Sequence, residues 1–311
     1  MVCSRSGMLR RALLLLSHNH WMRQWMEHSP LSRKLTMRFI AGRTLDDGIR
    51  VLCRLSSEHI LGTLDFLGEN VRSLEEASAS RDSYLAALQE ISQAGLHATV
   101  SIKLTQFGLD FSADVCRRNV EALVIQAQKI GTRVEVDMES SEYVDRTLDI
   151  VRSLHEQYPG HVRAVIQAYL YRSEADIAAL SEMKIPIRLC KGAYREPPSV
   201  AFPRKADVDA NFVKLMKYLL DRGTDPAIAS HDERIVTEAL SYVAGRHLAP
   251  ERFEFQMLYG IRRDLQRRIV SAGHRLRLYV PYGDAWYPYF MRRLAERPAN
   301  VFFLAKNLLR N

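Results

Sequence analysis

The feature that most constrains this chain is a regular alternation of short β-prone runs with segments of helical periodicity. Successive runs start roughly 20 to 40 residues apart, which is the size of a βα unit. Eight such runs occur, at Gly62–Gly68, Ala98–Leu104, Arg133–Met138, Val162–Ala168, Ile185–Cys190, Pro226–Ser230, Arg252–Gln256 and Leu276–Val280. The helical segments between them include Leu74–Gln93, Ser112–Lys129, Tyr143–Tyr158, Val208–Arg222 and Asp232–Tyr242.

Eight strands that are each followed by a helix predict an α/β fold of the (βα)8 barrel type, whose usual length is ~250 residues. A doubly wound open sheet would usually bring the GxGxxG fingerprint, but no two glycines are separated by a single residue. We expect residues 61–311 to form the barrel and residues 1–60 to form a helical extension. Within this extension, we favour a structural helix around Met8–His28 over an organellar transit segment.

Composition excludes several classes of protein. The longest strictly apolar run, Ala12–Leu16, is far shorter than the ~20 residues that a membrane span requires. The four cysteines are far apart and form no CxxC pair, and there is no HExxH motif, so we expect neither a disulfide scaffold nor a metal site. The net charge of +8 could attract a phosphate-bearing cofactor, whereas the absence of any nucleic-acid-binding motif argues against that partner. A reducing, cytoplasmic location is expected.

Polar residues concentrate at the predicted strand ends. Active sites of such barrels lie at the carboxyl ends of the strands and in the loops that follow. An isolated polar residue there can pair with a neighbour or cap a helix, but polar groups on nearly every strand imply a polar ligand. The strand-end residues are Asp65, Glu69, Lys103, Asp137, Met138, Glu139, Gln167, Arg188, Lys191, Gly192, Ala193, Tyr194, Ser230, His231, Asp232, Gln256 and Tyr279.

Seven motifs at these strand ends resemble one family. They are SIKLTQFGLD (101–110), VDMESS (136–141), VIQAYLYRSEADI (165–177), RLCKGAYREP (188–197), IASHDERIV (228–236), FEFQMLYGIR (253–262) and YVPYGDAWYPYFMRRLAERPANV (279–301). In this order, and from about Phe39 to the C-terminus, they resemble proline dehydrogenase, most of all the monofunctional bacterial enzymes. The resemblance implies a distorted (βα)8 barrel with its last helix over the barrel mouth, bound FAD, oxidation of L-proline to 1-pyrroline-5-carboxylate, and a membrane quinone as electron acceptor.

The resemblance also implies substrate-binding residues. Proline carries a carboxylate, which a planar guanidinium can bind through two hydrogen bonds. Arg292 and Arg293 would bind this carboxylate, with Lys103 as a third cation. The residues expected to surround the proline ring are Tyr194, Leu258 and Tyr279. Glu69 would pair with Arg188 as a gate over the substrate.

The cofactor-binding residues follow from the same resemblance. Arg188 would lie near flavin N5, and Gln167 would hydrogen-bond the isoalloxazine edge, next to Met138. Lys191, Gly192 and Ala193 follow Arg188, and the glycine would let the backbone approach the cofactor closely. Ser230 and His231 would bind the ribityl or pyrophosphate region.

Asp137 has two open roles in this scheme. It could act as a catalytic base, although its reference pKa of ~3.9 matches a secondary ammonium poorly. Alternatively it orients Lys103 and Tyr279 and shapes the electric field. Together with Arg188 it forms the predicted catalytic pair.

Several alternatives remain open from the sequence. The scaffold could oxidise hydroxyproline, or a different class of barrel enzyme, a lyase or aldolase, could form a Schiff base on Lys103 or Lys191. A non-catalytic basic barrel that binds nucleic acid is the third alternative. The Leu-rich, Arg-bearing N-terminal helix could contact the inner face of the cell membrane peripherally, or pack on the barrel or on another subunit of an oligomer.

Overall fold

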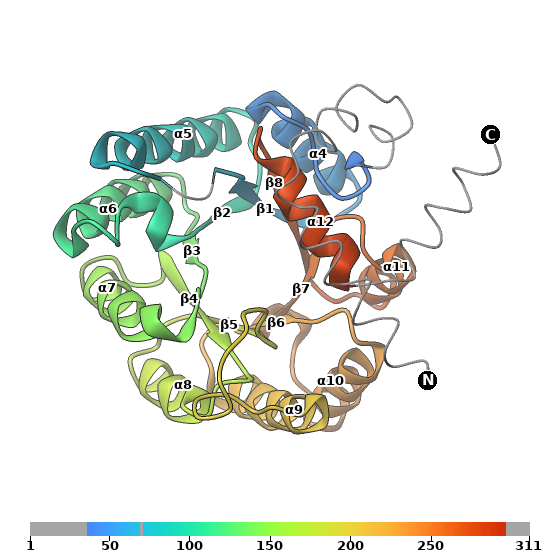
Figure 1. Cartoon of the computed structure of the whole chain (residues 1–311). Helices are drawn as coiled ribbons and strands as arrows, with labels where there is room; N and C mark the ends of the chain where they lie inside the picture. The colour runs from blue at the N-terminus through green and yellow to red at the C-terminus, as the bar shows by residue number, and fades with distance from the viewer. Residues whose placement is uncertain (1–35, 69–70, 297–311) are drawn as a thin grey trace.

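The computed structural model describes residues 36–68 and 71–296, with side chains up to residue 291. Eight parallel strands form a closed barrel in sequence order, and β8 pairs with β1 from Leu61↔Arg277 to Phe66↔Tyr282 (Figure 1). The strands are β1 (Leu61–Phe66), β2 (Ala98–Ile102), β3 (Val134–Val136), β4 (Val162–Gln167), β5 (Ile187–Cys190), β6 (Ala227–Ala229), β7 (Glu254–Leu258) and β8 (Leu276–Tyr282). The predicted (βα)8 barrel is therefore confirmed.

Helices surround this barrel on its outside (Figure 1). They are α4 (Leu45–Ser57), α5 (Leu74–Gln93), α6 (Ala113–Lys129), α7 (Val144–Gln157), α8 (Ser173–Glu182), α9 (Lys205–Arg222), α10 (Glu233–Gly245), α11 (Arg263–Ser271) and α12 (Trp286–Glu296). The last of them, α12, crosses one end of the barrel, as predicted for the final helix. No helix in residues 36–68 and 71–296 combines the length and apolarity needed to cross a membrane.

Local sequence signals explain several helix boundaries. Thr44 begins α4 with a capping box, in which its side chain accepts from the Asp47 backbone N–H and Asp47 bonds back to Thr44. Ser73, Ser112 and Asp232 cap the starts of α5, α6 and α10 in the same way, by accepting backbone N–H groups that lack a helical partner. These polar residues therefore position the helices that follow the strands.

The observed elements differ from the predicted ones mainly at strand ends. The strand β7 begins at Glu254 because Pro250–Arg252 form a 3-10 turn, and it continues to Leu258 because Leu258 pairs with Tyr279 of β8. The α4 helix lies before the predicted boundary between the extension and the barrel, and it packs its buried Val51, Leu52 and Leu55 against the barrel core. The boundary between residues 60 and 61 stays a prediction. The predicted helix Met8–His28 lies outside the described residues.

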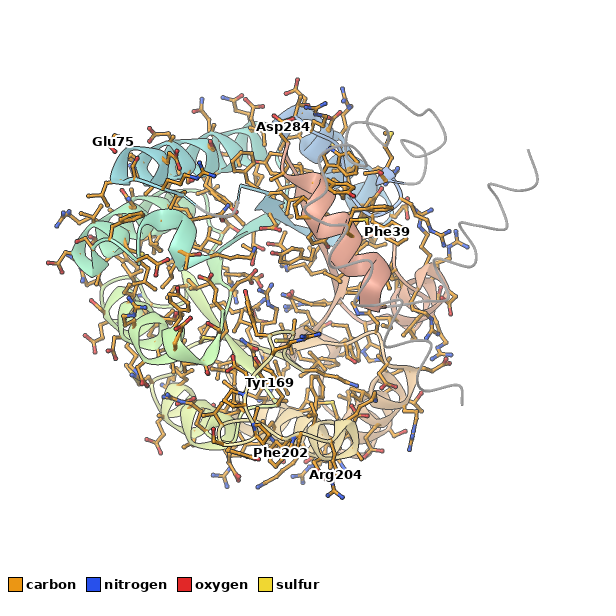
Figure 2. All side chains as sticks on the ribbon, in the orientation of Figure 1. Phe39, Glu75, Tyr169, Phe202, Arg204 and Asp284 are labelled. Carbon is orange, nitrogen blue, oxygen red and sulfur yellow. The ribbon has the colours of Figure 1, made fainter. Side chains whose placement is uncertain are left out.

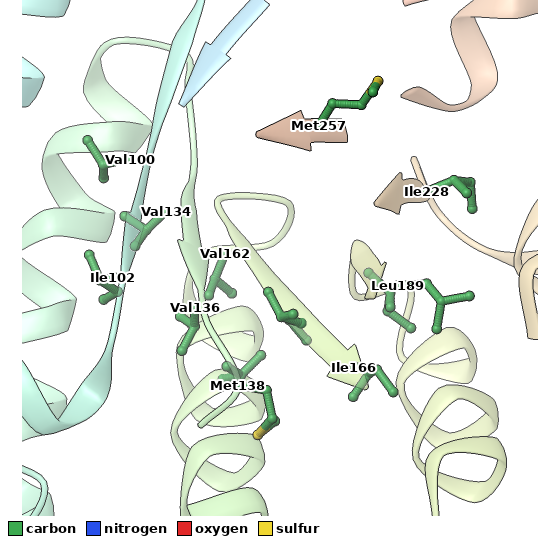
Figure 3. Packing of buried hydrophobic residues seen from close by; sticks show 14 of the residues in the cluster. Val100, Ile102, Val134, Val136, Met138, Val162, Ile166, Leu189, Ile228 and Met257 are labelled. Carbon is green, nitrogen blue, oxygen red and sulfur yellow. The ribbon is translucent and has the colours of Figure 1, made fainter. Parts of the chain in front are cut away.

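Apolar side chains fill the layer between strands and helices. Val100, Ile102, Val134 and Val136 belong to this cluster and are fully buried (Figure 3). Burial of such branched side chains stabilises the fold by about 1.5–3 kcal/mol each. Side chains along each strand point alternately into this layer and into the barrel, because successive side chains of a strand lie on opposite faces.

The barrel interior, in contrast, is filled by paired charges. Figure 2 shows that side chains occupy it. Arg163 is among the largest fully buried side chains of the described residues. Arg163 donates to Glu135 (3.2 Å), to Glu254 (2.6 Å) and to Asp225 (2.9 Å), and Arg277 donates to Glu254 as well (2.9 Å). Burial alone raises the pKa of Glu254, but the guanidinium groups of Arg277 and Arg163 outweigh it and hold that pKa well below its usual range. These carboxylates thus stay ionised inside the barrel.

We predict that Gly260→Ala destabilises the fold by about 3 kcal/mol, because it adds a clash to an unfavourable backbone conformation. Gly260 has a φ of +77°, and a Cβ atom there would lie 1.7 Å from the Arg38 carbonyl oxygen. Gly273 is the matched control, with a φ of +79° and nothing within 4 Å of its Cβ position. Its replacement by Ala should cost only ~1 kcal/mol. Urea unfolding measures both, and equal losses would contradict the prediction.

Candidate active site

Five predicted site residues lie on or directly after the strands, and three of them contact one another. Arg188 of β5, Asp137 after β3 and Tyr279 of β8 contact one another, while Lys103 follows β2. Gln167 ends β4, beside the strand that carries Arg188. The structure therefore brings together, at the mouth predicted by the barrel fold, residues that are far apart in sequence.

The Arg188 guanidinium is held by four acceptors. Its Nη1 donates to Glu135 Oε2 (3.0 Å) and Gln256 Oε1 (3.1 Å), and its Nη2 donates to Ser101 Oγ (3.1 Å) and to Asp137. Burial alone lowers the pKa of this guanidinium, but the carboxylates of Asp137 and Glu135 outweigh it and raise the pKa. These bonds use both hydrogens of each Nη atom, so the Nε–H is the donor of Arg188 that they leave over. Arg188 is thus a fixed cation with one donor to spare.

The Asp137 carboxylate accepts from three donors. Ser101 Oγ and Tyr279 Oη each donate to it at 2.8 Å, and Arg188 is the third donor. Burial, followed by the charges of Asp137 and Asp65, raises the pKa of Tyr279 well above its usual value, so its phenol keeps the proton that it donates. This arrangement favours the orienting role of Asp137 over the role of a base, because its oxygens are already engaged.

Lys103 lies beside a second buried carboxylate. Its Nζ is 3.6 Å from Asp65 Oδ1, and Asp65 is only 1% exposed. Asp137 contacts Tyr279, as one of its two predicted roles requires, but the ion pair of Lys103 is formed with Asp65 of β1. The carboxylate of Asp65 favours the charged ammonium, so Lys103 presents a cation at the mouth.

Gln167 offers an unpartnered acceptor in the same region. Its Nε2 donates to the carbonyl oxygens of Met138 (3.0 Å) and Glu139 (2.7 Å), which fixes the amide. Its Oε1 is buried and has no hydrogen-bond partner. A buried acceptor usually has a donor, so this atom indicates a ligand. Met138 contributes its carbonyl oxygen to this contact, while its side chain packs in the apolar core.

The loop after β5 is fastened to its neighbours. Lys191 Nζ donates to Asp209 (2.5 Å) and to Asp232 (3.0 Å), so two carboxylates balance its charge. Gly192 has a φ of +105°, and a Cβ atom there would lie 2.4 Å from the Tyr169 ring. The glycine was expected to permit close approach of a cofactor. The structure shows that it also permits close approach of the ring of Tyr169, which is labelled in Figure 2, and the contact with a cofactor stays a prediction. Ala193 and Tyr194, which follow it, are exposed.

The same loop is held by a further contact, and the sequence did not indicate this contact. Glu196 accepts from the Ser141 backbone N–H (2.8 Å) and from its hydroxyl (2.5 Å), and Leu170 pairs with Ala201 in an antiparallel bridge. The loops after β3, β4 and β5 are therefore joined at the barrel mouth.

Ser230 and His231 connect the ends of β6 and β7. The Ser230 hydroxyl accepts from the Asp232 backbone N–H (3.1 Å). His231 Nε2 accepts from the Leu258 backbone N–H (2.7 Å), so the ring is neutral and carries its proton on Nδ1. Leu258 itself is half-buried beside the cluster that supports α12.

Three predicted residues cannot be placed. Glu69 lies outside the described residues, and so do the side chains of Arg292 and Arg293, although their backbone belongs to α12. This helix is held on the barrel by an apolar cluster that includes Phe39, Phe290 and Trp286. The cluster consequently sets the position of the helix that carries both arginines.

Glu135, Ser101 and Gln256 contribute to the site without an assigned role in the sequence analysis. Glu135 lies two residues before Asp137, and Ser101 lies two residues before Lys103, so the period of two in a strand places each pair on the same face. This spacing of two residues is the signal that could have identified Glu135 and Ser101. Among residues 36–68 and 71–296, no group of three His, Cys, Asp or Glu side chains could hold a metal ion.

Comparisons with known proteins agree on one family. The family model described as "Proline dehydrogenase" matches residues 49–306. Proline dehydrogenase 1 of Bacillus subtilis (strain 168) is 38% identical over 303 residues, which cover 97% of this chain and 100% of that protein. Proline dehydrogenase of Deinococcus radiodurans is 39% identical over 280 residues, which cover 89% of this chain and 90% of that protein.

A solved structure of a longer protein has the same fold. The crystal structure of proline utilization A (PutA) from Bdellovibrio bacteriovorus inactivated by N-propargylglycine matches with a TM-score of 0.82 at 26% identity. The match covers 93% of this chain but only 36% of the PutA chain. The resemblance to the shorter, monofunctional enzymes is therefore confirmed, as is the barrel.

We predict that Cys190 reacts with a thiol reagent about 10²-fold more slowly than an ordinary exposed thiol at pH 8, because only the thiolate attacks. Cys190 ends β5 at the mouth, and burial raises the pKa of its thiol to about 11. Cys53 is exposed and serves as the internal reference. Time-resolved labelling of the native protein in a Cys3→Ser background, followed by peptide mass spectrometry, measures both rates. Equal rates would contradict the prediction.

Proposed function

The chain belongs to the proline dehydrogenase family, and from this premise we propose that it oxidises L-proline to 1-pyrroline-5-carboxylate with bound FAD. The electrons would pass to a quinone, the acceptor that the family resemblance implies. A bound flavin would supply the hydride acceptor for this reaction. The residues of the chain would bind proline, orient it and stabilise the charge that develops.

The observation that carries this proposal is a buried acceptor without a partner at the mouth, Oε1 of Gln167, which lies on the strand beside Arg188. The four hydrogen bonds of Arg188 use its Nη atoms and leave its Nε–H over as a further donor. An isoalloxazine ring carries both hydrogen-bond acceptors and an N–H donor along its edge, so these two residues fit it. Hydrophobic ligands without such an edge would leave the Gln167 oxygen unsatisfied.

Further residues would hold the rest of the cofactor. His231 is oriented with its proton on Nδ1, and it follows Ser230 at the end of β6. Lys191, Gly192 and Ala193 follow β5, where the positive φ of Gly192 turns the backbone. We infer that these residues contact the ribityl and pyrophosphate parts, which require donors and a cation.

The substrate would be bound by its carboxylate. Lys103, kept as an ammonium beside Asp65, would supply one cation, and Arg292 and Arg293 of α12 would supply two more. Tyr279, Leu258 and Tyr194 would border the proline ring. The charge of Arg188 would stabilise the negative charge that the reduced ring gains.

The geometry disfavours the lyase alternative. A Schiff-base lysine must lose its proton to attack a carbonyl group, and it is usually desolvated or placed beside another cation. Lys103 lies beside Asp65, and Lys191 lies between Asp209 and Asp232, so both amines are engaged in ion pairs with carboxylates. We therefore retain the flavin-dependent oxidation.

The proposed function predicts that anaerobic L-proline bleaches the visible flavin absorption of the purified yellow protein, because hydride transfer reduces the flavin. Pyrrolidine is the matched control, since it has the same ring and amine but no carboxylate for the cations to bind. It should leave the absorption unchanged at the same concentration. A colourless protein, or one that L-proline does not bleach, would overturn the proposed function.

A further prediction concerns the two arginines proposed to bind the carboxylate of proline. Arg292→Met or Arg293→Met should raise the KM for proline by about 10- to 100-fold, because each removes a charged hydrogen bond. The flavin content should stay at the wild-type level. Arg267→Met replaces an exposed arginine of α11 and is the control, with an unchanged KM expected. Wild-type kinetics in either α12 variant would show that the arginine does not bind the substrate.

A further inference from the structure

A carboxylate below the mouth contacts Arg188, and the proposed function assigns no role to it. Glu135 of β3 is fully buried, and its Oε2 accepts from Arg188 Nη1 at 3.0 Å. Asp137, two residues further along the chain, accepts from Nη2 of the same guanidinium. One carboxylate in β3 and one directly after it thus hold the two Nη atoms of Arg188, the first from beneath and the second at the mouth.

Glu135 is itself held in place by other partners. Its Oε1 accepts from Thr99 Oγ1 (3.0 Å) and from Arg163 Nη1 (3.2 Å). Burial alone raises the pKa of Glu135, but the charges of Arg163, Arg188 and Arg277 outweigh it and lower the pKa. The side chain is therefore an ionised anchor between Arg163 below and Arg188 above.

Gln256 of β7 completes this anchor. Its Oε1 accepts from Arg188 Nη1 (3.1 Å), while its Nε2 donates to Glu135 Oε2 (3.1 Å) and to Glu254 (2.7 Å). The amide can make all three bonds only in this orientation, because an NH2 group turned toward the guanidinium would face another donor. Glu135 and Gln256 thus fix Nη1 from two different strands.

From these contacts we propose that Glu135, supported by Gln256, is a positioning residue for the oxidation of proline. This inference rests on the proposed function. Glu135 sets the place of the Arg188 guanidinium, and with it the direction of the Nε–H that remains for a ligand. A displacement of about 1 Å at such a group can slow a reaction by about 10²-fold. The competing explanation is that Glu135 only balances the charge of the buried arginines.

The experiment compares Glu135→Asp with Glu254→Asp. Both glutamates are fully buried and paired with arginines, and both substitutions keep the charge while they shorten the side chain by one methylene. Of the two glutamates, only Glu135 accepts from Arg188 directly, whereas Glu254 accepts from Arg163 and Arg277 and reaches Arg188 only through Gln256. A general loss of stability should therefore affect both variants, and displacement of Arg188 should be much larger in the first.

Three quantities are measured on each flavin-loaded protein. They are the limiting rate of flavin reduction by L-proline in anaerobic stopped flow, the half-saturating proline concentration, and the midpoint potential from titration with a chemical reductant in the absence of proline. For Glu135→Asp we expect a reduction rate about 10- to 100-fold lower and a lower midpoint potential, because the cation withdraws from the charge that it stabilises. The half-saturating concentration should stay within about 3-fold, since the carboxylate-binding cations are unchanged.

Glu254→Asp should leave the reduction rate within about 3-fold of the wild-type rate and the potential close to the wild-type value, because its only link to Arg188 runs through Gln256, even where urea unfolding shows a comparable loss of stability. Equal slowing in both variants, or a wild-type rate and potential in Glu135→Asp, would overturn the positioning role. If Glu135→Asp does not fold, Gln256→Met provides the decision, because it removes the second acceptor of Nη1 and should also slow flavin reduction. A wild-type rate in that variant would then overturn the inference.

The wild-type protein separates this inference from the proposed function. If L-proline does not reduce the wild-type flavin, the proposed function fails and the inference fails with it. If L-proline reduces the wild-type protein and Glu135→Asp equally fast, only the positioning role of Glu135 is lost.

Discussion

The balance of charge inside the barrel is the constraint on which the rest of the structure depends. Moving one ion from water into a protein interior costs several kcal/mol, and loss of a single partner leaves the other charge uncompensated. Arg163, Arg188 and Arg277 are all buried, and Glu135 and Glu254 are their shared acceptors. The same ion pairs therefore connect strands across the barrel interior and hold the guanidinium of the site, so the fold and the site cannot vary independently.

The separation of apolar side chains on the outer face of the strands from charged side chains inside the barrel also determines the register of the strands. The apolar layer lies between the strands and the helices, while the inward positions of β3, β5 and β7 carry Glu135, Arg188 and Gln256. A slip of one residue would turn each of these side chains into the apolar layer and leave it without a partner. Polar residues inside the barrel consequently specify the pairing of strands more strictly than a uniformly apolar interior would.

The sequence sufficed for what is local and failed for what depends on distant partners. Helix α5 was predicted at its observed bounds, because periodicity and a Ser N-cap are encoded in adjacent residues. The strand ends indicated Arg188, Gln167, Asp137 and Gln256. They did not indicate that Ser101 and Gln256 accept from Arg188, since these residues lie 87 and 68 residues away from it. Gly192 was recognised as a close-approach position, yet only the fold could show that the neighbour is Tyr169.

The two parts of the candidate site rest on different supports. Arg188, Asp137 and Tyr279 are held by the charged interior, whereas α12 is seated by a separate apolar cluster around Phe39 and Phe290. Apolar contacts are non-directional, so this cluster positions α12 through the shape and area of the packed side chains. Charged hydrogen bonds, by contrast, fix distances and angles. A substitution in the apolar cluster can therefore alter the seating of α12 while the partners of Arg188 stay in place.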